Sequence, residues 1–232
     1  MATTTTNFGW DIPQSTDLVK DGATAIAALG QDIDTAFVDF KGGTTGQVLK
    51  KTSGTDLDVE WGTASSGLTL INTTSFSAVS SISVNDVFSA TYRNYVVIYD
   101  LTAASANNNH TLRLRVGGAD NSTASSYKSA TSNMLDNGTI GNNNTTGATS
   151  WFVGTTKSTD VEWSRVELHF FAPFATQRTN LLQLAIGVSG GGNLFSEYGN
   201  HGHNAATSFT GFTILFSSGT VTGSVSTYGL AV

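Results

Sequence analysis

The residues with the clearest potential for chemistry are two histidines, His201 and His203, which are separated by a single glycine. In an extended segment, side chains at positions i and i+2 point to the same side. Two imidazoles from each of three chains around an axis could therefore surround an octahedral transition-metal ion. The alternative is a loop in which these histidines have no special role. We favour the loop, and predict neither a bound metal nor a cofactor.

A second segment, residues 187–191, has the sequence Gly-Val-Ser-Gly-Gly and so matches the G-x-S-x-G pattern of hydrolases, with Glu197 and His201 following in the expected order. A nucleophile elbow requires a strand that leads directly into a helix, and partners that lie far away in the sequence. Here glycine and loop residues follow the serine, and both partners lie within a few residues. The segment therefore indicates a glycine-rich turn.

Asp160 and Glu162 are the best pair of carboxylates for glycoside hydrolysis, because they would alternate on one face of a strand predicted over residues 161–171. Glycosidases need two such groups at a fixed separation. Solvated strand ends explain the two residues equally well. We therefore predict that the protein is not an enzyme.

Composition limits the classes of partner. Only 12% of residues are charged and the net charge is −6, whereas the chain has 13 Phe, 6 Tyr, 4 Trp and no Cys. Clusters of Lys and Arg, which nucleic acids and anionic membranes attract, are missing from the sequence. No apolar run is long enough for a membrane span, and the first ten residues lack a signal-peptide pattern. We expect synthesis in a cytoplasm, no membrane insertion and no nucleic-acid partner.

The elements that would position such residues begin with an N-terminal segment, residues 1–41. Phe8, Trp10 and Ile12 are apolar anchors in an otherwise polar tail. Such a tail is either a frayed terminus or a docking peptide whose aromatics insert into a partner.

Residues 16–40 have the apolar spacing of a helix, with Thr16 or Asp17 able to cap its first turn and Gly42-Gly43 to end it. The apolar residues lie seven apart, with others between them: Val19, Ile26, Leu29, Ile33, Ala36 and Phe40. This stripe would be buried either on its own domain or against symmetry-related copies of the chain.

The pattern of residues 42–67 predicts a small β linker. A strand near Gln47, turn residues at 53–56 and the alternation of Leu57, Val59 and Trp61 with acidic residues are typical of a hairpin. Residues 64–67 are a Ser- and Gly-rich connection to the rest of the chain.

The remaining residues, 68–232, alternate between apolar and polar over several short segments, and no convincing helix interrupts them. We predict strands over residues 96–101, 111–116, 161–171, 181–188, 209–216 and 225–232. Long polar loops are expected at 117–126 and 133–150. The sequence therefore predicts a mainly β protein, with a C-terminal antiparallel β-sandwich, jelly-roll-like, after a short N-terminal helix and the β linker.

Two stretches resemble bacteriophage proteins. The segment GTTGQVLKKTSGTDLDVEW (residues 43–61) is similar to a linker near the start of phage tail-fibre and other virion appendage proteins. The opening stretch LTLINTTSFSAVSSISV, then YRNYVVIYDL, LRLRVGG and the closing YGLAV resemble the C-terminal heads of tail-fibre and head-fibre proteins. In LRLRVGGADN, two glycines replace the Asn-Gly-Asp of the usual pattern, so Asp120 would have to supply any ligand that the missing aspartate carries.

The resemblance implies a virion protein that is a homotrimer. Its N-terminus would dock on other virion proteins through Phe8, Trp10 and Ile12, and the stripe from Val19 to Phe40 would form the trimer contact. The head would recognise a host surface, with a bacterial glycan as the expected ligand. One alternative is a capsid decoration or head-fibre protein with no direct role in adsorption. Another is a free sugar-binding lectin.

The residues that bind a receptor are not identified by the sequence. Aromatic rings stack on sugars and amides bond to hydroxyls, so the candidates are the aromatics Tyr127, Trp151 and Tyr198, and the asparagines at 107–109 and 142–144.

Overall fold

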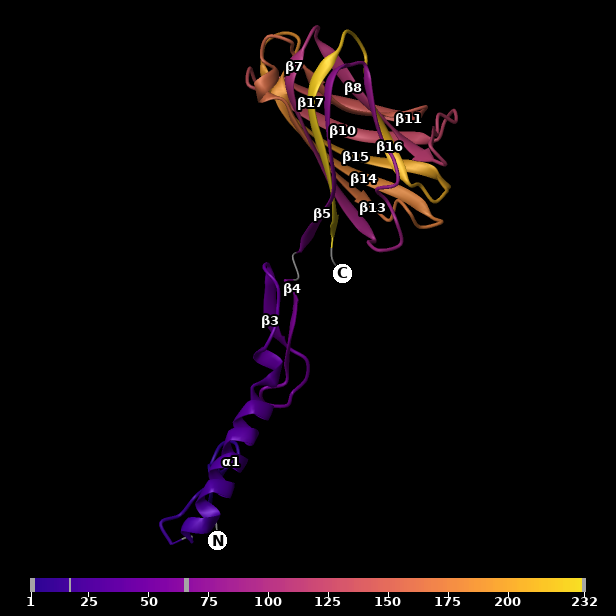
Figure 1. Cartoon of the computed structure of the whole chain (residues 1–232). Coiled ribbons are helices and arrows are strands. Elements are labelled where there is room, and N and C mark those ends of the chain that lie inside the picture. The colour runs from indigo at the N-terminus through magenta and orange to yellow at the C-terminus, as the bar shows by residue number, and fades with distance from the viewer. Residues whose placement is uncertain (1–2, 17, 65–66, 231–232) are drawn as a thin grey trace. The chain divides into compact units, whose positions relative to one another are not determined.

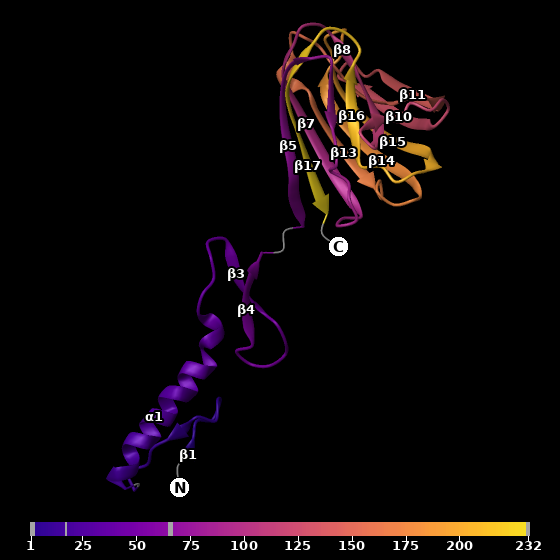
Figure 2. The same ribbon diagram turned by 45° about the vertical axis from the view of Figure 1, so that its right-hand side comes forward.

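A computed structural model describes residues 3–16, 18–64 and 67–230 of the chain. The chain divides into two compact units, residues 1–65 and residues 66–232. Figure 1 shows both units along the chain, and Figure 2 shows them from a second direction. The segment predicted at 1–41 lies in the first unit, as does the segment predicted at 42–67 except for its last two residues, and the segment predicted as the head lies in the second.

The N-terminal unit contains one long helix and two small hairpins. Strand β1 (Thr3–Thr4) pairs with β2 (Asp11–Ile12), helix α1 runs over Val19–Ala36, and the 3-10 helix η1 over Val38–Phe40. Strand β3 (Gln47–Lys51) then pairs with β4 (Val59–Thr63), with Leu49 opposite Trp61. The predicted helix and β linker are confirmed.

The two ends of α1 differ in how well they were predicted. The residue that caps its N-terminus is Leu18, which provides no side-chain hydrogen bond, so the expected cap by Thr16 is wrong. Asp17 lies outside the described residues. At the other end, α1 itself stops at Ala36, and the 3-10 helix η1 continues the helical segment to Phe40. Gly42 and Gly43 follow with φ values of +91° and +82°, in the left-handed region that glycine adopts easily. The predicted end before these glycines holds for the helical segment as a whole but is wrong for α1, which ends earlier.

The C-terminal unit, called the head below, consists of two antiparallel sheets with one core between them (Figure 1). The order in the first sheet is β11 (Ile140–Ala148), β10 (Tyr127–Leu135), β15 (Leu194–Ala206), β14 (Arg178–Val188), β13 (Arg165–Phe171), β7 (Asn94–Ala104), β17 (Val221–Leu230) and β5 (Leu68–Val79). In the second sheet it is β12 (Trp151–Thr156), β8 (Asn108–Val116), β16 (Gly211–Phe216) and β6 (Ser81–Val84), with β9 (Ala119–Asp120) paired to β8. The predicted mainly β, sandwich-like fold is confirmed.

Alternation along the strands explains the core. On β13, Val166, Leu168 and Phe170 are buried, as predicted. The rings of Phe88, Phe170 and Phe212 lie within 5.0 to 5.9 Å of one another between the sheets. Val116 was also expected to point inward, but it is exposed, because it is the last residue of β8 and lies beyond the cover of the core.

The loop expected over residues 133–150 is wrong. Most of it belongs to the hairpin of β10 and β11, which turns at Gly138 with a φ of +84°. β11 is an edge strand with little buried surface, so its asparagines and threonines need no apolar alternation. Backbone pairing with β10 suffices to hold it in the sheet.

The strand expected over residues 161–171 begins only at Arg165, because Val161–Trp163 form the 3-10 helix η2. Asp160 lies in the turn before η2 and Glu162 within it. The two carboxylates therefore do not share a strand face, and the spacing that suggested a glycosidase pair is wrong. Asp160 instead pairs with Lys157 at 2.8 Å, and hydrogen bonds from Lys157 and Thr159 lower the pKa of its carboxyl group.

Candidate functional site

The two histidines lie on β15, and both are buried inside the head. Their side chains point to the same side, as predicted, but the segment is a strand and not the loop that we favoured. Nε2 of His201 lies 2.6 Å from the carbonyl oxygen Oε1 of Gln183, and Nδ1 lies 2.9 Å from the hydroxyl of Ser129. Since Oε1 can only accept, Nε2 carries the proton and Nδ1 accepts from Ser129.

The buried environment of His201 explains why its imidazole is uncharged. Burial lowers the pKa of its imidazole to about 4, so the ring is neutral at pH 7. Both nitrogens are engaged within the chain and face its interior, an arrangement that does not fit a metal shared with neighbouring copies. Among the described residues, no group of three or more His, Asp or Glu side chains is arranged to hold a metal ion.

The G-x-S-x-G segment forms the connection between β14 and β15. The hydroxyl of Ser189 accepts a hydrogen bond from the backbone N–H of Asn193 at 3.3 Å, which closes a tight turn. The turn is followed by strand β15 and not by a helix. Glu197 and His201 are buried on the inner face of that strand. The segment is a turn, as the sequence indicated.

Asp120 is held by groups of its own chain. Its carboxylate accepts hydrogen bonds from the guanidinium of Arg115 and from the hydroxyl of Thr213, the latter at 2.6 Å. Arg115 also donates to Ser83 at 3.1 Å and to Asn85 at 2.8 Å, so this cluster ties β8 to β16 and β6. Asp120 therefore does not fit the role of a free ligand that the resemblance left open to it.

Two of the three aromatic candidates for sugar binding are wrong, because they belong to the core. The side chains of Tyr127 and Trp151 are fully buried and pack edge to face at 5.1 Å. The Tyr127 hydroxyl donates to the backbone carbonyl of Asn121 at 2.6 Å, and burial raises the pKa of this phenol to about 12. Neither ring is accessible to a sugar.

Tyr198, by contrast, is 59% exposed on the outer face of the first sheet. Ser132 of β10 lies opposite Tyr198 on one side and opposite Asn142 of β11 on the other. Residues directly opposite in an antiparallel pair share a face. The hydroxyls of Tyr198 and Ser132 and the amide of Asn142 therefore form one row across three strands.

A second row lies beside the first. Ala130 is opposite Asn200 on β15 and opposite Asn144 on β11. Next to these, a hollow of about 300 Å³ is lined by Lys128, Ser129, Ala130, Thr145, Thr146, Asn180, Asn200, His201 and Gly202. We name the exposed residues Tyr198, Ser132, Asn142, Asn144, Asn180, Asn200 and Lys128 the amide face.

The amide face combines features that suit a neutral, hydroxyl-rich ligand. Amides donate and accept at once, as sugar hydroxyls do, and an exposed tyrosine ring gives a flat apolar surface. Sequence reasoning found Tyr198, Asn142 and Asn144 but missed Asn180, Asn200, Ser132 and Lys128. Alternation of buried and exposed residues along β14 and β15 places Asn180 and Asn200 on the outward side, and this pattern could have identified them from the sequence. Their proximity follows from strand pairing that the sequence does not reveal.

The remaining asparagines that the sequence suggested for sugar binding, at 107–109, differ in their exposure to solvent. The side chain of Asn108 is buried and bonds to backbone groups at Ala106 and Ser218. Asn107 and Asn109 are exposed, but Asn107 accepts hydrogen bonds from Ser158. The structure therefore assigns part of this group to holding loops together.

An apolar area adjoins the amide face on the same sheet. Ile98, Leu184 and Ile186 line a hollow of about 200 Å³ together with Arg165 and Glu167. Leu184 and Ile186 are exposed to solvent, with Met134 and Leu194 exposed on neighbouring strands. Exposed apolar side chains that gather on one face are typical of proteins that associate through that face.

The stripe on α1 is the most exposed apolar feature of the N-terminal unit. No residue of the 18-residue helix is buried. The exposed fractions are 97% for Val19, 66% for Ile26 and 40% for Ile33; Phe40 is also exposed, and Leu29 is half-buried. Among the described residues of its own unit, nothing therefore buries the stripe, although Leu29 and Ala36 are partly covered.

The proposed docking residues are ordered against the helix. The rings of Phe8 and Trp10 stack at 4.8 Å, and Trp10 lies 6.4 Å from Phe37 just after the end of α1. Phe8 and Ile12 remain exposed, while Trp10 is half-buried. Of the three residues, Phe8 and Ile12 therefore have accessible side chains.

No protein-family model, no curated protein and no solved structure matches this chain. Within the described residues, no helix has the length and apolar character that crossing a membrane requires. The argument for function therefore rests on the surfaces described above.

Proposed function

We propose that the protein is a homotrimeric, tail-fibre-type subunit of a bacteriophage virion, which docks through its N-terminal unit and binds a host-surface glycan with its head. The observation that carries the proposal is the uncovered stripe on α1, where Val19, Ile26 and Ile33 recur every seven residues without a buried contact. A short helix gains most of its stability from packing its apolar face. Other copies of the chain supply that packing.

The apolar area on the head supports the same assembly. Leu184 and Ile186 lie beside the ion pair of Arg165 with Asp100 at 2.7 Å, and beside Glu167, which is hydrogen-bonded to His169 at 2.5 Å. In a homotrimer this area would contact a different surface of the next copy, because the interface around a threefold axis is heterologous. Trimers, and not other oligomers, are the expectation that the resemblance to phage fibres provides.

The amide face supports glycan binding. Residues 68–232 contain eight acidic and seven basic residues, so the head is nearly neutral. Around Tyr198, Asn142 and Asn200, the exposed polar groups are amides and hydroxyls, with Lys128 as a single cation in the hollow. Such a surface matches uncharged sugar hydroxyls better than phosphates or acidic peptides.

The experiment is a binding assay of the full-length protein on a panel of purified bacterial surface polysaccharides. We expect at least one polysaccharide to bind, and Tyr198→Ala and Asn200→Ala each to weaken it about tenfold or more. Trp163→Ala is the matched control, since Trp163 is also exposed but belongs to η2. Equal binding by all variants would exclude the amide face. Failure of the whole panel would favour the capsid-decoration alternative.

A further inference from the structure

Two edge strands of the head, β11 of the first sheet and β12 of the second, line one hollow of about 440 Å³, which we name the edge groove. Strand β8 and the turn between β14 and β15 complete its walls. The residues that line it include Asn109, Asn143, Thr145, Phe152, Thr155 and Ser189. Its volume lies within the range of about 300–1,000 Å³ for small-molecule sites. The edge groove is therefore large enough for a small ligand or for one segment of a longer ligand.

A β-bulge in β12 places the aromatic and polar groups of the groove on one face. Phe152 lies opposite Thr111 of β8 and Thr155 lies opposite Asn109, and the register shifts between these two pairs. Thr111 and Asn109 are two residues apart on a strand, so their side chains share a face. Without the extra residue of the bulge, Phe152 and Thr155 would point to opposite faces. The bulge therefore brings the phenyl ring and the hydroxyl to the same side, and both line the groove.

The polar groups of the groove are held in place and keep donors for a ligand. The hydroxyl of Thr155 donates to the carbonyl of Asn108 at 2.8 Å and lies 3.3 Å from Oδ1 of Asn109. Within the described residues, Nδ2 of Asn109 donates no hydrogen bond. The hydroxyl of Ser189 accepts from the N–H of Asn193, which leaves its own proton to donate. A ligand in the groove therefore meets an amide donor and a hydroxyl donor beside an aromatic ring.

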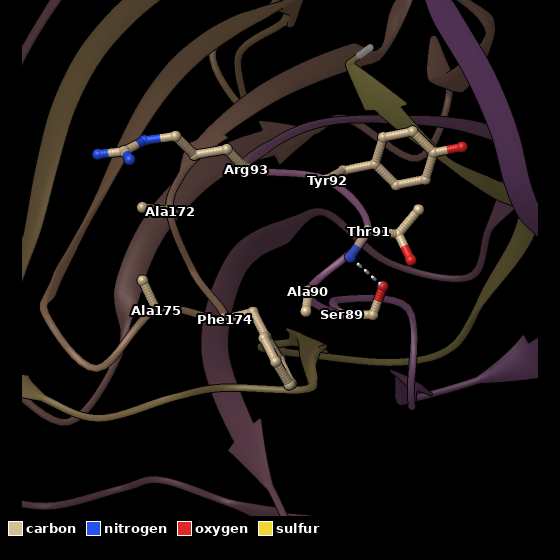
Figure 3. A pocket seen from close by; sticks show the side chains of 8 residues that line it. All are labelled: Ser89, Ala90, Thr91, Tyr92, Arg93, Ala172, Phe174 and Ala175. Carbon is tan, nitrogen blue, oxygen red and sulfur yellow. Dashed lines mark hydrogen bonds between the residues drawn. The ribbon is translucent and has the colours of Figure 1, made fainter. Parts of the chain in front are cut away.

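The edge groove is uncharged, since none of the described residues that line it is ionisable. Another hollow of the head, of about 330 Å³, lies between the loops that connect β6 to β7 and β13 to β14 (Figure 3). There the guanidinium of Arg93 points away from the ring of Phe174 and from the hydroxyls of Ser89 and Thr91. That lining does not converge on one ligand. The edge groove, by contrast, offers neutral polar groups and an aromatic ring on one side of β12.

The edge groove adjoins the amide face at β11. Thr145 lines both the groove and the hollow beside the amide face. Side chains alternate along β11, so Asn142 and Asn144 belong to the amide face, whereas Asn143 between them lines the groove. β11 is the edge of its sheet, and no further strand of the described chain pairs with its outer side. A long ligand can therefore pass over β11 and contact both sites.

We propose that the edge groove is a second subsite for the glycan of the amide face, so that one neutral polysaccharide chain crosses β11 and occupies both sites. Phe152 contacts the apolar face of a sugar ring, and Asn109 and Ser189 donate hydrogen bonds to its hydroxyls. This inference rests on the proposed function and deepens it. The ligand is then a stretch of several sugars within a chain, and not a single terminal sugar.

The test is isothermal titration calorimetry of the full-length protein with the neutral polysaccharide that binds most tightly in the panel, cut into single repeat units and into fragments of several repeats. We expect the long fragments to bind about tenfold or more tightly than the single repeat, because two linked subsites add avidity. Phe152→Leu, Asn109→Ala and Tyr198→Ala should each remove most of this advantage of length. Phe171→Leu is the matched control, because Phe171 is 42% exposed on β13 and lines neither hollow. Circular dichroism checks that each variant is folded.

The outcomes separate this inference from the proposed function. Equal affinity of the wild type for short and long fragments would overturn it. So would unchanged binding of long fragments by Phe152→Leu and Asn109→Ala, and if Tyr198→Ala still weakens binding, the amide face stands without the groove. Weakening by Phe152→Leu but not by Tyr198→Ala would contradict a chain that spans both sites. An equal loss in Phe171→Leu would contradict the role of the groove. If no neutral polysaccharide binds, the inference fails together with the proposed function.

Discussion

Helix α1 and the β head both have regular apolar patterns, but only the head buries them. In the head, inward residues of both sheets, such as Leu112, Leu168 and Phe212, have no exposed surface. In α1, no residue is buried, although its stripe repeats every seven residues. The comparison teaches that a periodic pattern predicts the type of element but not the molecule that covers it.

The difference has an energetic consequence. Gly22 and Gly30 each weaken α1 by about 1 kcal/mol relative to alanine, and its last turn lacks the basic residue that would favour its dipole. Its N-cap adds no side-chain hydrogen bond. Our proposal therefore makes the helix dependent on contacts with other copies, whereas the head is stabilised by its own core.

The largest expected effect on folding stability concerns the core of the head. Trp151→Ala should destabilise the head by about 3–5 kcal/mol, because it leaves a cavity where a fully buried indole packs on Tyr127 and His203. Chemical denaturation followed by fluorescence measures the loss. Trp163→Ala is the matched control: Trp163 is 55% exposed, so its loss should cost less than about 1 kcal/mol. Equal losses would contradict the assigned core.

The next prediction concerns two substitutions that disrupt the uncovered apolar stripe on α1. Ile26→Asp combined with Ile33→Asp should remove about 3–6 kcal/mol of association energy per chain, at about 1.5–3 kcal/mol for each buried isoleucine. The trimer should dissociate, and the helical circular-dichroism signal should fall while the head stays folded.

The matched control for this change is Thr24→Asp combined with Gln31→Asp, which adds the same charge at exposed positions seven residues apart but off the stripe. It should leave assembly intact. If both double variants behave alike, the stripe is not the contact between copies.

The smallest expected effect is a dependence of folding stability on pH. It should be found in the head and not in α1, because the buried histidines lie only in the head. The pKa of His201 falls from 6.5 to about 4 in the folded state, so the unfolded chain binds more protons between these values. Its contribution, about 3 kcal/mol at about 1.36 kcal/mol per pKa unit, is present above pH 6.5 and lost as pH falls toward 4. The pKa of His110 is lowered to about 3 by burial and adds to the same trend.

Glu197 faces the same interior and acts in the opposite direction. Burial raises the pKa of its carboxyl group, so its contribution is lost as pH rises. Denaturation at pH 7 and pH 4.5 should show a smaller pH dependence in His201→Gln than in the wild type. His169→Gln is the control, since His169 is only half-buried. An unchanged pH dependence in His201→Gln would contradict the buried, neutral imidazole.

The sequence predicted the fold where alternation was strong and failed where it was weak. Val166, Leu168 and Phe170 identified β13 because one face of that strand is buried. β11 could not be found in the same way, since an edge strand of asparagine and threonine carries no apolar alternation. Trp151 was assigned to the surface because an aromatic residue suits a core and a sugar site equally well.

The candidate sites were predictable only in part, for a related reason. Tyr198, Asn142 and Asn144 were identified from residue type, but pairing between β10, β11 and β15 is what brings them into adjacent rows. Arg93 and Phe174 are about eighty residues apart in the sequence, yet both line the hollow between two loops of the head. No local pattern in the sequence indicates that these loops lie side by side.

The most direct test of the central claim is the solution mass of the full-length protein by sedimentation equilibrium. The single chain has a mass of 24.2 kDa. If α1 is covered by two other copies, the mass should be about three times this value, about 73 kDa. A mass of 24.2 kDa that does not change with concentration would contradict the account, because the stripe would then remain uncovered in solution.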